Sequence, residues 1–211
     1  MVKRLGKWSL TSVSGALVIL VYCLFTLVSW VYYPYPYSPQ SNYLSRLGNF
    51  DYNPSGAIFY NLGCIFTGLV LVPFFVSLYW LHSDYRIASA VLRIGLVFGV
   101  LSAIALIMIG VYSEDQGSPH MQASSTFFLL NFVVLLLVNI ALLFHHGILR
   151  PVPLYGLVVD LSSLVFAFTT SGPLLEWYTV FGALLFVGFL AFNTQKLVFL
   201  QSETSLSIET E

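Results

Sequence analysis

Two carboxylates and a histidine lie close together in one short polar segment of the sequence. Glu114, Asp115 and His120 combine carboxylate oxygens with an imidazole, a set that can exchange protons with a substrate or bind a metal ion. Ser45, from an earlier polar segment, adds a hydroxyl that could act as a nucleophile or orient a substrate. The candidate catalytic residues are therefore His120, Asp115, Glu114 and Ser45.

A metal site is not predicted from this set. Only His120 lies in these segments, and no His-x-x-x-His or His-x-x-Glu spacing occurs. No cofactor is predicted either, because the chain lacks a phosphate-binding glycine loop and a dinucleotide fingerprint. The alternative interpretation is that His120 occupies an exposed first turn of a helix while Glu114 and Asp115 are solvated in a loop.

Further polar residues lie in the same segments or beside them and could form a binding surface. If these segments converge on one mouth, their side chains would surround a ligand with charge and with hydrogen-bond donors and acceptors. The predicted binding residues are Asn42, Tyr43, Ser45, Arg46, Asn61 and Glu176.

Asp160 is an ionisable residue within an apolar segment, and such residues need a partner. Arg93 lies at a similar depth from the same membrane surface, roughly 10 Å at 1.5 Å per residue. We predict an intramembrane ion pair between Arg93 and Asp160, on which the fifth helix depends. The alternative is a proton or ion relay, although no other acid lies within a span to continue the path.

Small residues recur at every fourth position in the third apolar segment, at Gly95, Gly99 and Ala103. This spacing lets a second helix approach closely. The partner helix could belong to the same chain, which is the simpler interpretation, or to a second copy in a homo-oligomer.

Long apolar segments are the elements that must position all these residues. The chain has 211 residues, of which 58% are hydrophobic and 8% charged, and no charged residue falls within 8–45, 52–83, 94–113 or 116–149. A bilayer core of about 30 Å needs roughly 20 apolar residues per helix. We predict an all-α polytopic membrane protein, a bundle of six transmembrane helices at about residues 10–32, 55–80, 87–112, 120–145, 153–171 and 174–198.

Basic residues predict the orientation of this bundle, because they are enriched in cytoplasmic loops. With the amino terminus inside, only Arg46 falls outside. We therefore expect a multi-pass protein of the cell membrane with both termini in the cytoplasm, made of one transmembrane domain (1–200) and a polar, acidic cytoplasmic tail (201–211). The basic residues expected on the cytoplasmic side are Lys3, Arg4, Lys7, Arg86, Arg93, Arg150 and Lys196.

The first outer loop, about residues 33–54, is long and begins with a tyrosine-rich stretch typical of the membrane interface. Ser38 and Pro39 could begin a short helix that ends at Gly48, with Tyr43, Leu44 and Leu47 on its apolar face. Such a helix would lie flat over the outer ends of the bundle as a lid or anchor. The alternative is an ordered linker.

Several short motifs resemble a known family. Residues 42–48 read NYLSRLG, Asn53-Pro54 follows, and Asn61-Leu62-Gly63 enters the second helix. Residues 110–115 read GVYSED, and His120 then leads toward Ser124, Phe127 and Phe128. These motifs resemble a prokaryotic membrane family described as the domain of unknown function nine-nine-eight. A more distant likeness is to the six-helix Frag/DRAM membrane proteins.

The resemblance covers most of the first four helices and implies a membrane fold without implying an activity. The family usually has an acid after the loop serine, whereas this chain has Arg46. That departure argues against a catalytic Ser–Asp–His set.

Three functions are compatible with these observations. The first is a bundle that binds a membrane lipid or a protein partner through an outward-facing polar pocket, including a role as an accessory subunit of a membrane complex. The second is a membrane-embedded lipid hydrolase or transferase at the outer face, and the third is a small ion or solute transporter using Asp160. Nucleic-acid binding is not expected, because the basic residues only flank the spans.

Overall fold

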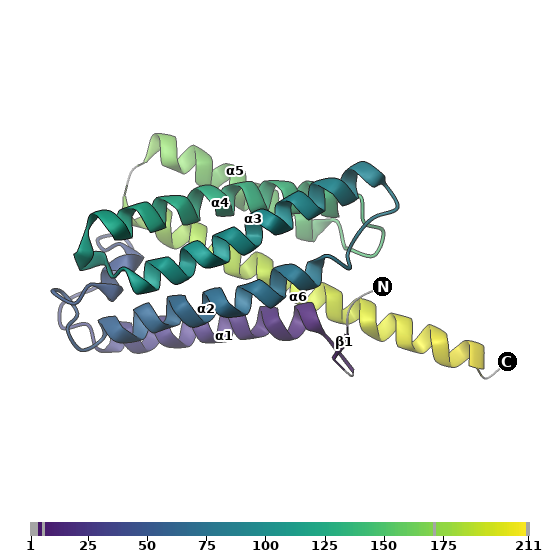
Figure 1. Cartoon of the computed structure of the whole chain (residues 1–211), viewed down its shortest axis with the longest axis horizontal. Coiled ribbons are helices and arrows are strands. Elements are labelled where there is room, and N and C mark those ends of the chain that lie inside the picture. The colour runs from purple at the N-terminus through teal and green to yellow at the C-terminus, as the bar shows by residue number, and fades with distance from the viewer. Residues whose placement is uncertain (1–3, 6, 171, 210–211) are drawn as a thin grey trace.

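The computed structural model is dominated by six long helices (Figure 1). It describes residues 4–5, 7–170 and 172–209, with side chains for 7–170 and 172–201. Two short 3-10 helices, η1 (Leu44–Gly48) and η2 (Glu114–Gln116), lie in the connections. The long helices are α1 (Leu10–Val31), α2 (Ala57–Leu78), α3 (Arg86–Val111), α4 (Ser118–Leu142), α5 (Pro151–Thr169) and α6 (Pro173–Glu209).

Each of the six helices contains a stretch long and apolar enough to cross a membrane. A helix satisfies its backbone hydrogen bonds internally, which the bilayer core requires. The chain is therefore a multi-pass integral membrane protein, and the predicted all-α six-helix fold is confirmed. Helix ends agree with the prediction to about three residues, except that α6 continues through Glu209 into the segment predicted as a polar tail.

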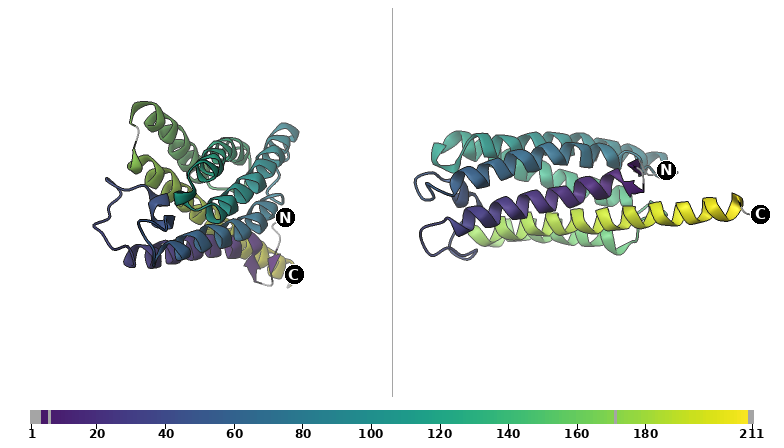
Figure 2. Two further views of the ribbon diagram at one scale, coloured as in Figure 1. Left: turned by 60° about the vertical axis from the view of Figure 1, so that its left-hand side comes forward. Right: turned by 90° about the horizontal axis from the view of Figure 1, so that it is seen from below.

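Consecutive helices pack side by side from α1 to α4, and α6 returns to lie against α1. Helix α5 packs on α4 and α6. The two ends of the chain lie at the same end of the bundle (Figures 1 and 2). We call this the termini end, and we call the opposite end, which carries η1 and η2, the η1 end.

A small hairpin that was not predicted precedes α1. Strand β1 (Arg4–Leu5) pairs antiparallel with β2 (Trp8–Ser9). Gln195 of α6 holds this segment: its Oε1 accepts from the Ser9 N–H at 2.9 Å, and its Nε2 donates to the Lys7 carbonyl at 3.1 Å. The hairpin thus ties the start of α1 to α6.

The small-residue stripe of α3 is used within the chain. A Cβ placed on Gly95 would lie 3.1 Å from Val138 of α4, and one on Gly99 would lie 2.6 Å from the ring of Phe75 on α2. Ala103 is fully buried. The stripe therefore packs against α2 and α4 of the same chain.

The predicted ion pair between Arg93 and Asp160 is wrong. Arg93 is exposed, and its Nε donates to the Ser89 carbonyl one turn back at 3.2 Å. Asp160 is 2% exposed, and its Oδ2 has no hydrogen-bond partner. Helix α5 packs on α4 and α6, so Asp160 does not face Arg93.

Candidate binding site at the η1 end of the bundle

The segment between α1 and α2 contains the 3-10 helix η1, which closes this end of the bundle. We call η1 the plug. Leu44 and Leu47 are completely buried, whereas Tyr43 is 44% exposed. The predicted flat helix from Ser38 is thus wrong in its length and in its orientation. Tyr43, Leu44 and Leu47 do not share one face that lies over the bundle. The two leucines point into the bundle instead, because a tight 3-10 turn fits where a longer helix would not.

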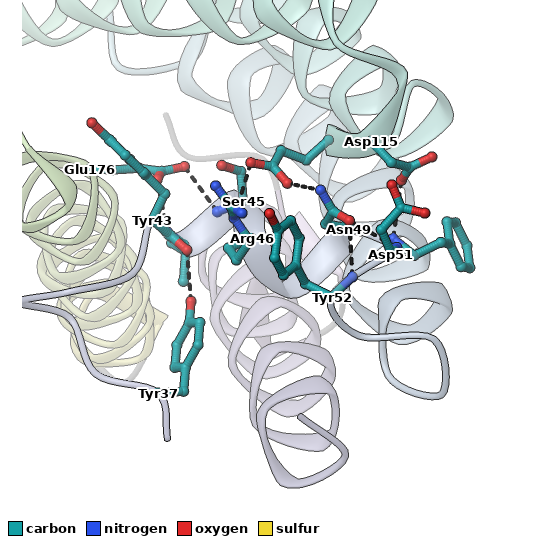
Figure 3. A network of polar contacts seen from close by, with 12 residues as sticks. Tyr37, Tyr43, Ser45, Arg46, Asn49, Asp51, Tyr52, Asp115 and Glu176 are labelled. Atoms are coloured by element: carbon teal, nitrogen blue, oxygen red, sulfur yellow. Dashed lines mark hydrogen bonds and ion pairs between the residues drawn. The ribbon is translucent and has the colours of Figure 1, made fainter. Parts of the chain in front are cut away.

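Glu176, in the first turn of α6, anchors the beginning of η1. Its Oε2 accepts from the Leu44 N–H at 2.8 Å, and its Oε1 accepts from the Ser45 N–H at 3.2 Å (Figure 3). These are backbone donors that a helix start leaves without internal partners, and a carboxylate satisfies both. Glu176 is thus joined to a segment more than a hundred residues away in the sequence.

Two asparagines anchor the end of η1. The Nδ2 of Asn53 donates to the Leu47 carbonyl at 2.8 Å and to the Ser29 Oγ of α1 at 3.0 Å, while its Oδ1 accepts from the Gly56 N–H at 3.1 Å. The Nδ2 of Asn61 donates to the Gly48 carbonyl at 3.0 Å. A Cβ on Gly48 would collide with Tyr60 at 2.7 Å and with Asn61, so only glycine permits this approach.

Arg46 and Glu114 form an ion pair on the rim of the plug, with Nε and Oε1 3.2 Å apart. The other Glu114 oxygen accepts from Asn49, and the Arg46 guanidinium lies 4.3 Å above the Tyr52 ring. Asp115 accepts from the Phe50 N–H at 3.1 Å. The two acids are therefore not simply solvated: they bind η2 to the first loop (Figure 3).

An aromatic cluster packs on the other side of the plug. The Nε1 of Trp177 donates to the Asn42 carbonyl at 3.0 Å, and the Tyr37 hydroxyl donates to the Tyr43 carbonyl at 2.8 Å. The rings of Trp30, Tyr37 and Trp177 contact one another. Burial raises the pKa of Tyr37, so this phenol stays a neutral donor.

His120 stands apart from this network. It is 5% exposed, so it does not occupy an exposed helix turn, and its Nδ1 lies 2.7 Å from the Tyr112 carbonyl. Across the described part of the chain, no hydrogen bond joins His120 to Ser45, Glu114 or Asp115. In the same part, no three His, Cys, Asp or Glu side chains are grouped as metal ligands would be. The four candidate catalytic residues are thus divided among separate contacts.

A narrow apolar cavity lies beneath the plug, inside the bundle. Ser45 and Glu176 line it at the η1 end, and its lining on α2 runs from Tyr60 to Leu78. At 1.5 Å per residue this corresponds to about 27 Å, close to the thickness of a bilayer core. The residues that line the cavity on α2 therefore extend along most of the membrane-spanning part of this helix.

Helices α4 and α6 form one side of the cavity. Phe127, Phe128 and Asn131 line it from α4, and Thr179 and Ala183 line it from α6; all five are half-buried. The end of α5 diverges from α4, and its side chains from Leu164 to Thr169 are mostly exposed (Figures 1 and 2). This side of the cavity is therefore only partly covered at the η1 end.

Three residues of α4 that line the cavity, Ser124, Phe127 and Phe128, were noted in the sequence only as part of the family resemblance, and none was predicted to line a cavity. Ser124, Phe127, Phe128 and Asn131 fall at the i, i+3, i+4 and i+7 positions of one helix face. This period was visible in the sequence. What it does not reveal is whether the face meets a neighbouring helix or a cavity.

Comparison with known proteins decides the family. The sequence profile of the family described as "Protein of unknown function (DUF998)" matches residues 15–199. The chain belongs to this family. No curated protein and no solved structure matches it.

The motifs by which the sequence resembles DUF998 coincide with the anchors of the plug. Asn42, Gly48, Asn53 and Asn61 all contribute contacts that hold η1 in place. Arg46, where this chain departs from the usual acid, forms the ion pair with Glu114. The DUF998 match spans all six helices and supplies no activity, so function must be argued from the geometry.

Proposed function

We propose that the protein binds a membrane lipid, with one hydrocarbon chain in the cavity and the head group at the η1 end. The observation that carries this proposal is the length and lining of the cavity. Its lining extends over about 27 Å of α2 and consists mainly of Leu, Val and Phe side chains. An apolar cavity gives a hydrocarbon chain favourable contacts and offers nothing to a soluble polar ligand.

The polar groups of the cavity support the same assignment of its two ends. Ser45 and Glu176 lie where the plug closes the bundle, and Phe74 and Leu78 line the far end. A lipid with its head group beside Ser45 would place its polar end next to these two residues. The half-buried faces of α4 and α6 offer it a lateral path from the membrane.

Lipid binding fits the site better than hydrolysis or group transfer. Catalysis by Ser45 and His120 needs the two side chains within hydrogen-bond reach. The imidazole instead engages the Tyr112 carbonyl, and Glu114 and Asp115 hold the first loop. These residues support the shape of the η1 end.

We further propose that the η1 end faces the outside of the cell membrane. Lys7, Arg86 and Arg150 lie toward the termini end, and Arg46 at the η1 end is paired with an acid. Basic residues favour the cytoplasmic side. The head group would then belong to a lipid of the outer leaflet.

The decisive experiment fills the cavity. Ala183 lines it from α6, so Ala183→Phe should exclude the hydrocarbon chain, whereas Ala90→Phe adds the same bulk to an exposed position of α3. Lipid retained after purification in detergent is extracted and quantified by mass spectrometry. We expect roughly one lipid per chain in the wild type and in Ala90→Phe, and much less in Ala183→Phe. Equal retention by the two variants would contradict the proposal.

A further inference from the structure

Three buried polar side chains on neighbouring helices carry oxygen atoms that have no hydrogen-bond partner. They are Asn139 of α4 and Asp160 and Ser163 of α5, which are 0%, 2% and 8% exposed. The unpartnered atoms are Asn139 Oδ1, Asp160 Oδ2 and Ser163 Oγ. Leaving such groups unsatisfied within a membrane is costly, so this concentration at one interface calls for a ligand.

Helices α4 and α5 pack against each other. Gly156 lies directly against Asn139, since a Cβ at that position would be 2.5 Å from Asn139 Oδ1. Asp160 and Ser163 follow Gly156 at i+4 and i+7, which places them on the same face of α5. The face that touches Asn139 is thus also the face that carries the carboxyl and hydroxyl groups.

The direction in which helical side chains lean shortens the expected distance between Asn139 and Asp160. Helical side chains lean toward the N-terminus of their own helix, so Asp160 and Ser163 lean back toward Gly156. Helices α4 and α5 are antiparallel, so Asn139 leans the opposite way, toward Asp160. The Nδ2 of Asn139 donates to the Leu135 carbonyl at 2.7 Å, which leaves Oδ1 as the free atom.

Among the described side chains, no basic residue forms an ion pair with Asp160. The ion pair found among the described side chains is Arg46 with Glu114 at the η1 end, and Arg93 turns to a backbone carbonyl. A single carboxylate with amide and hydroxyl oxygens is a set of hard oxygen ligands, suited to alkali and alkaline-earth cations. A monovalent cation neutralises the carboxylate, whereas a divalent cation would leave a net positive charge inside the membrane.

We propose that Asn139, Asp160 and Ser163 form a sodium-binding site between α4 and α5. This site is separate from the lipid cavity, because the residues that line the cavity include none of the three. The bound ion would satisfy the free oxygens and cross-link the two helices. Binding of the ion at this site does not depend on whether the cavity binds lipid.

Thermal unfolding of the purified full-length protein tests the site. The melting temperature is measured as NaCl replaces choline chloride at constant ionic strength and constant pH. We expect Tm to rise with Na⁺ concentration, by about 3 °C when Na⁺ is roughly tenfold above Kd. Asp160→Asn should abolish the rise, whereas Asp84→Asn, at an exposed loop acid, should keep it.

A second variant protects the test against a folding defect in Asp160→Asn. Ser163→Ala removes one ligand and keeps the carboxylate, so the Na⁺ concentration for half of the Tm rise should increase several-fold. The same Tm in NaCl and choline chloride for the wild type would overturn the proposal. So would a Na⁺ response that Asp160→Asn retains, or a Tm that changes with pH alone and identically in both salts, which would mean that the carboxyl is satisfied by a proton.

Discussion

The carboxylates at the η1 end differ in what they do for the protein. Glu176 satisfies two backbone N–H groups that have no other acceptor, at Leu44 and Ser45. Glu114 and Arg46 are 19% and 28% exposed, so water can replace much of their interaction. Loss of an acceptor from a buried donor costs about 1–3 kcal/mol, whereas a partly exposed ion pair contributes about 0–1 kcal/mol.

Substitution of these two positions should therefore have unequal effects. Glu176→Gln retains one acceptor oxygen but turns an amide donor toward a backbone N–H, so we expect a loss of about 1–3 kcal/mol. Arg46→Gln should cost less than about 1 kcal/mol. Thermal or denaturant unfolding in detergent measures both. A larger loss in Arg46→Gln than in Glu176→Gln would show that the plug depends on the Arg46–Glu114 ion pair and not on Glu176.

Asn53 is the most connected side chain of the first loop, and it is completely buried. Asn53→Ala leaves the Leu47 carbonyl and the Gly56 N–H without this partner. We expect a loss of about 2–4 kcal/mol, because more than one buried group becomes unsatisfied. Asn42→Ala, at a half-buried loop position, is the matched control and should cost less. Equal destabilisation would contradict the assigned role of Asn53.

Helix positions could be predicted well from the apolar segments, because the bilayer permits little besides helices. The plug could not be predicted equally well. Leu44 and Leu47 were recognised as apolar, but whether they cover the bundle or enter it depends on the space left between α1, α2 and α6. That space is set by contacts far apart in the sequence, such as Glu176 with Leu44.

The close packing of α2 on α3 predicts an effect of one added methyl group. In Gly99→Ala the new Cβ would lie 2.6 Å from the Phe75 ring, so the helices must separate. We expect a loss of about 1–3 kcal/mol in unfolding free energy. Val97→Leu, at a position 62% exposed on the same helix, should change it little. A stable Gly99→Ala variant would mean that α2 and α3 are less tightly packed than described.

The arrangement of the whole bundle explains why the predicted ion pair failed. Depth along a span follows from residue number, and on that basis Arg93 and Asp160 were predicted at similar heights. Rotation about the helix axis and the choice of neighbouring helices do not follow from residue number. Arg93 is on the exposed face of α3, and Asp160 is buried where α5 meets its own neighbours. The cavity could not be predicted from the sequence for the same reason, because it also depends on which helices are neighbours and how each is rotated.

Orientation in the membrane can be tested with single cysteines. Cys23 and Cys64 lie within α1 and α2, so both are first replaced by alanine. Gln40→Cys, in the first loop, should react with a membrane-impermeant maleimide on intact cells. Asp84→Cys, between α2 and α3, should react only after permeabilisation, because basic residues favour the cytoplasm. The reverse pattern would place the η1 end inside.

The proposed function requires the cavity beneath η1 to hold a hydrocarbon chain. An experimental density map of the wild-type protein in a lipid bilayer would show whether it does. We predict continuous, elongated density beginning beside Ser45 and Glu176 and running between α2 and the faces of α4 and α6 that carry Phe127 and Ala183. A bundle whose α4 and α6 close directly on α2, leaving no such density, would show that the cavity holds no lipid.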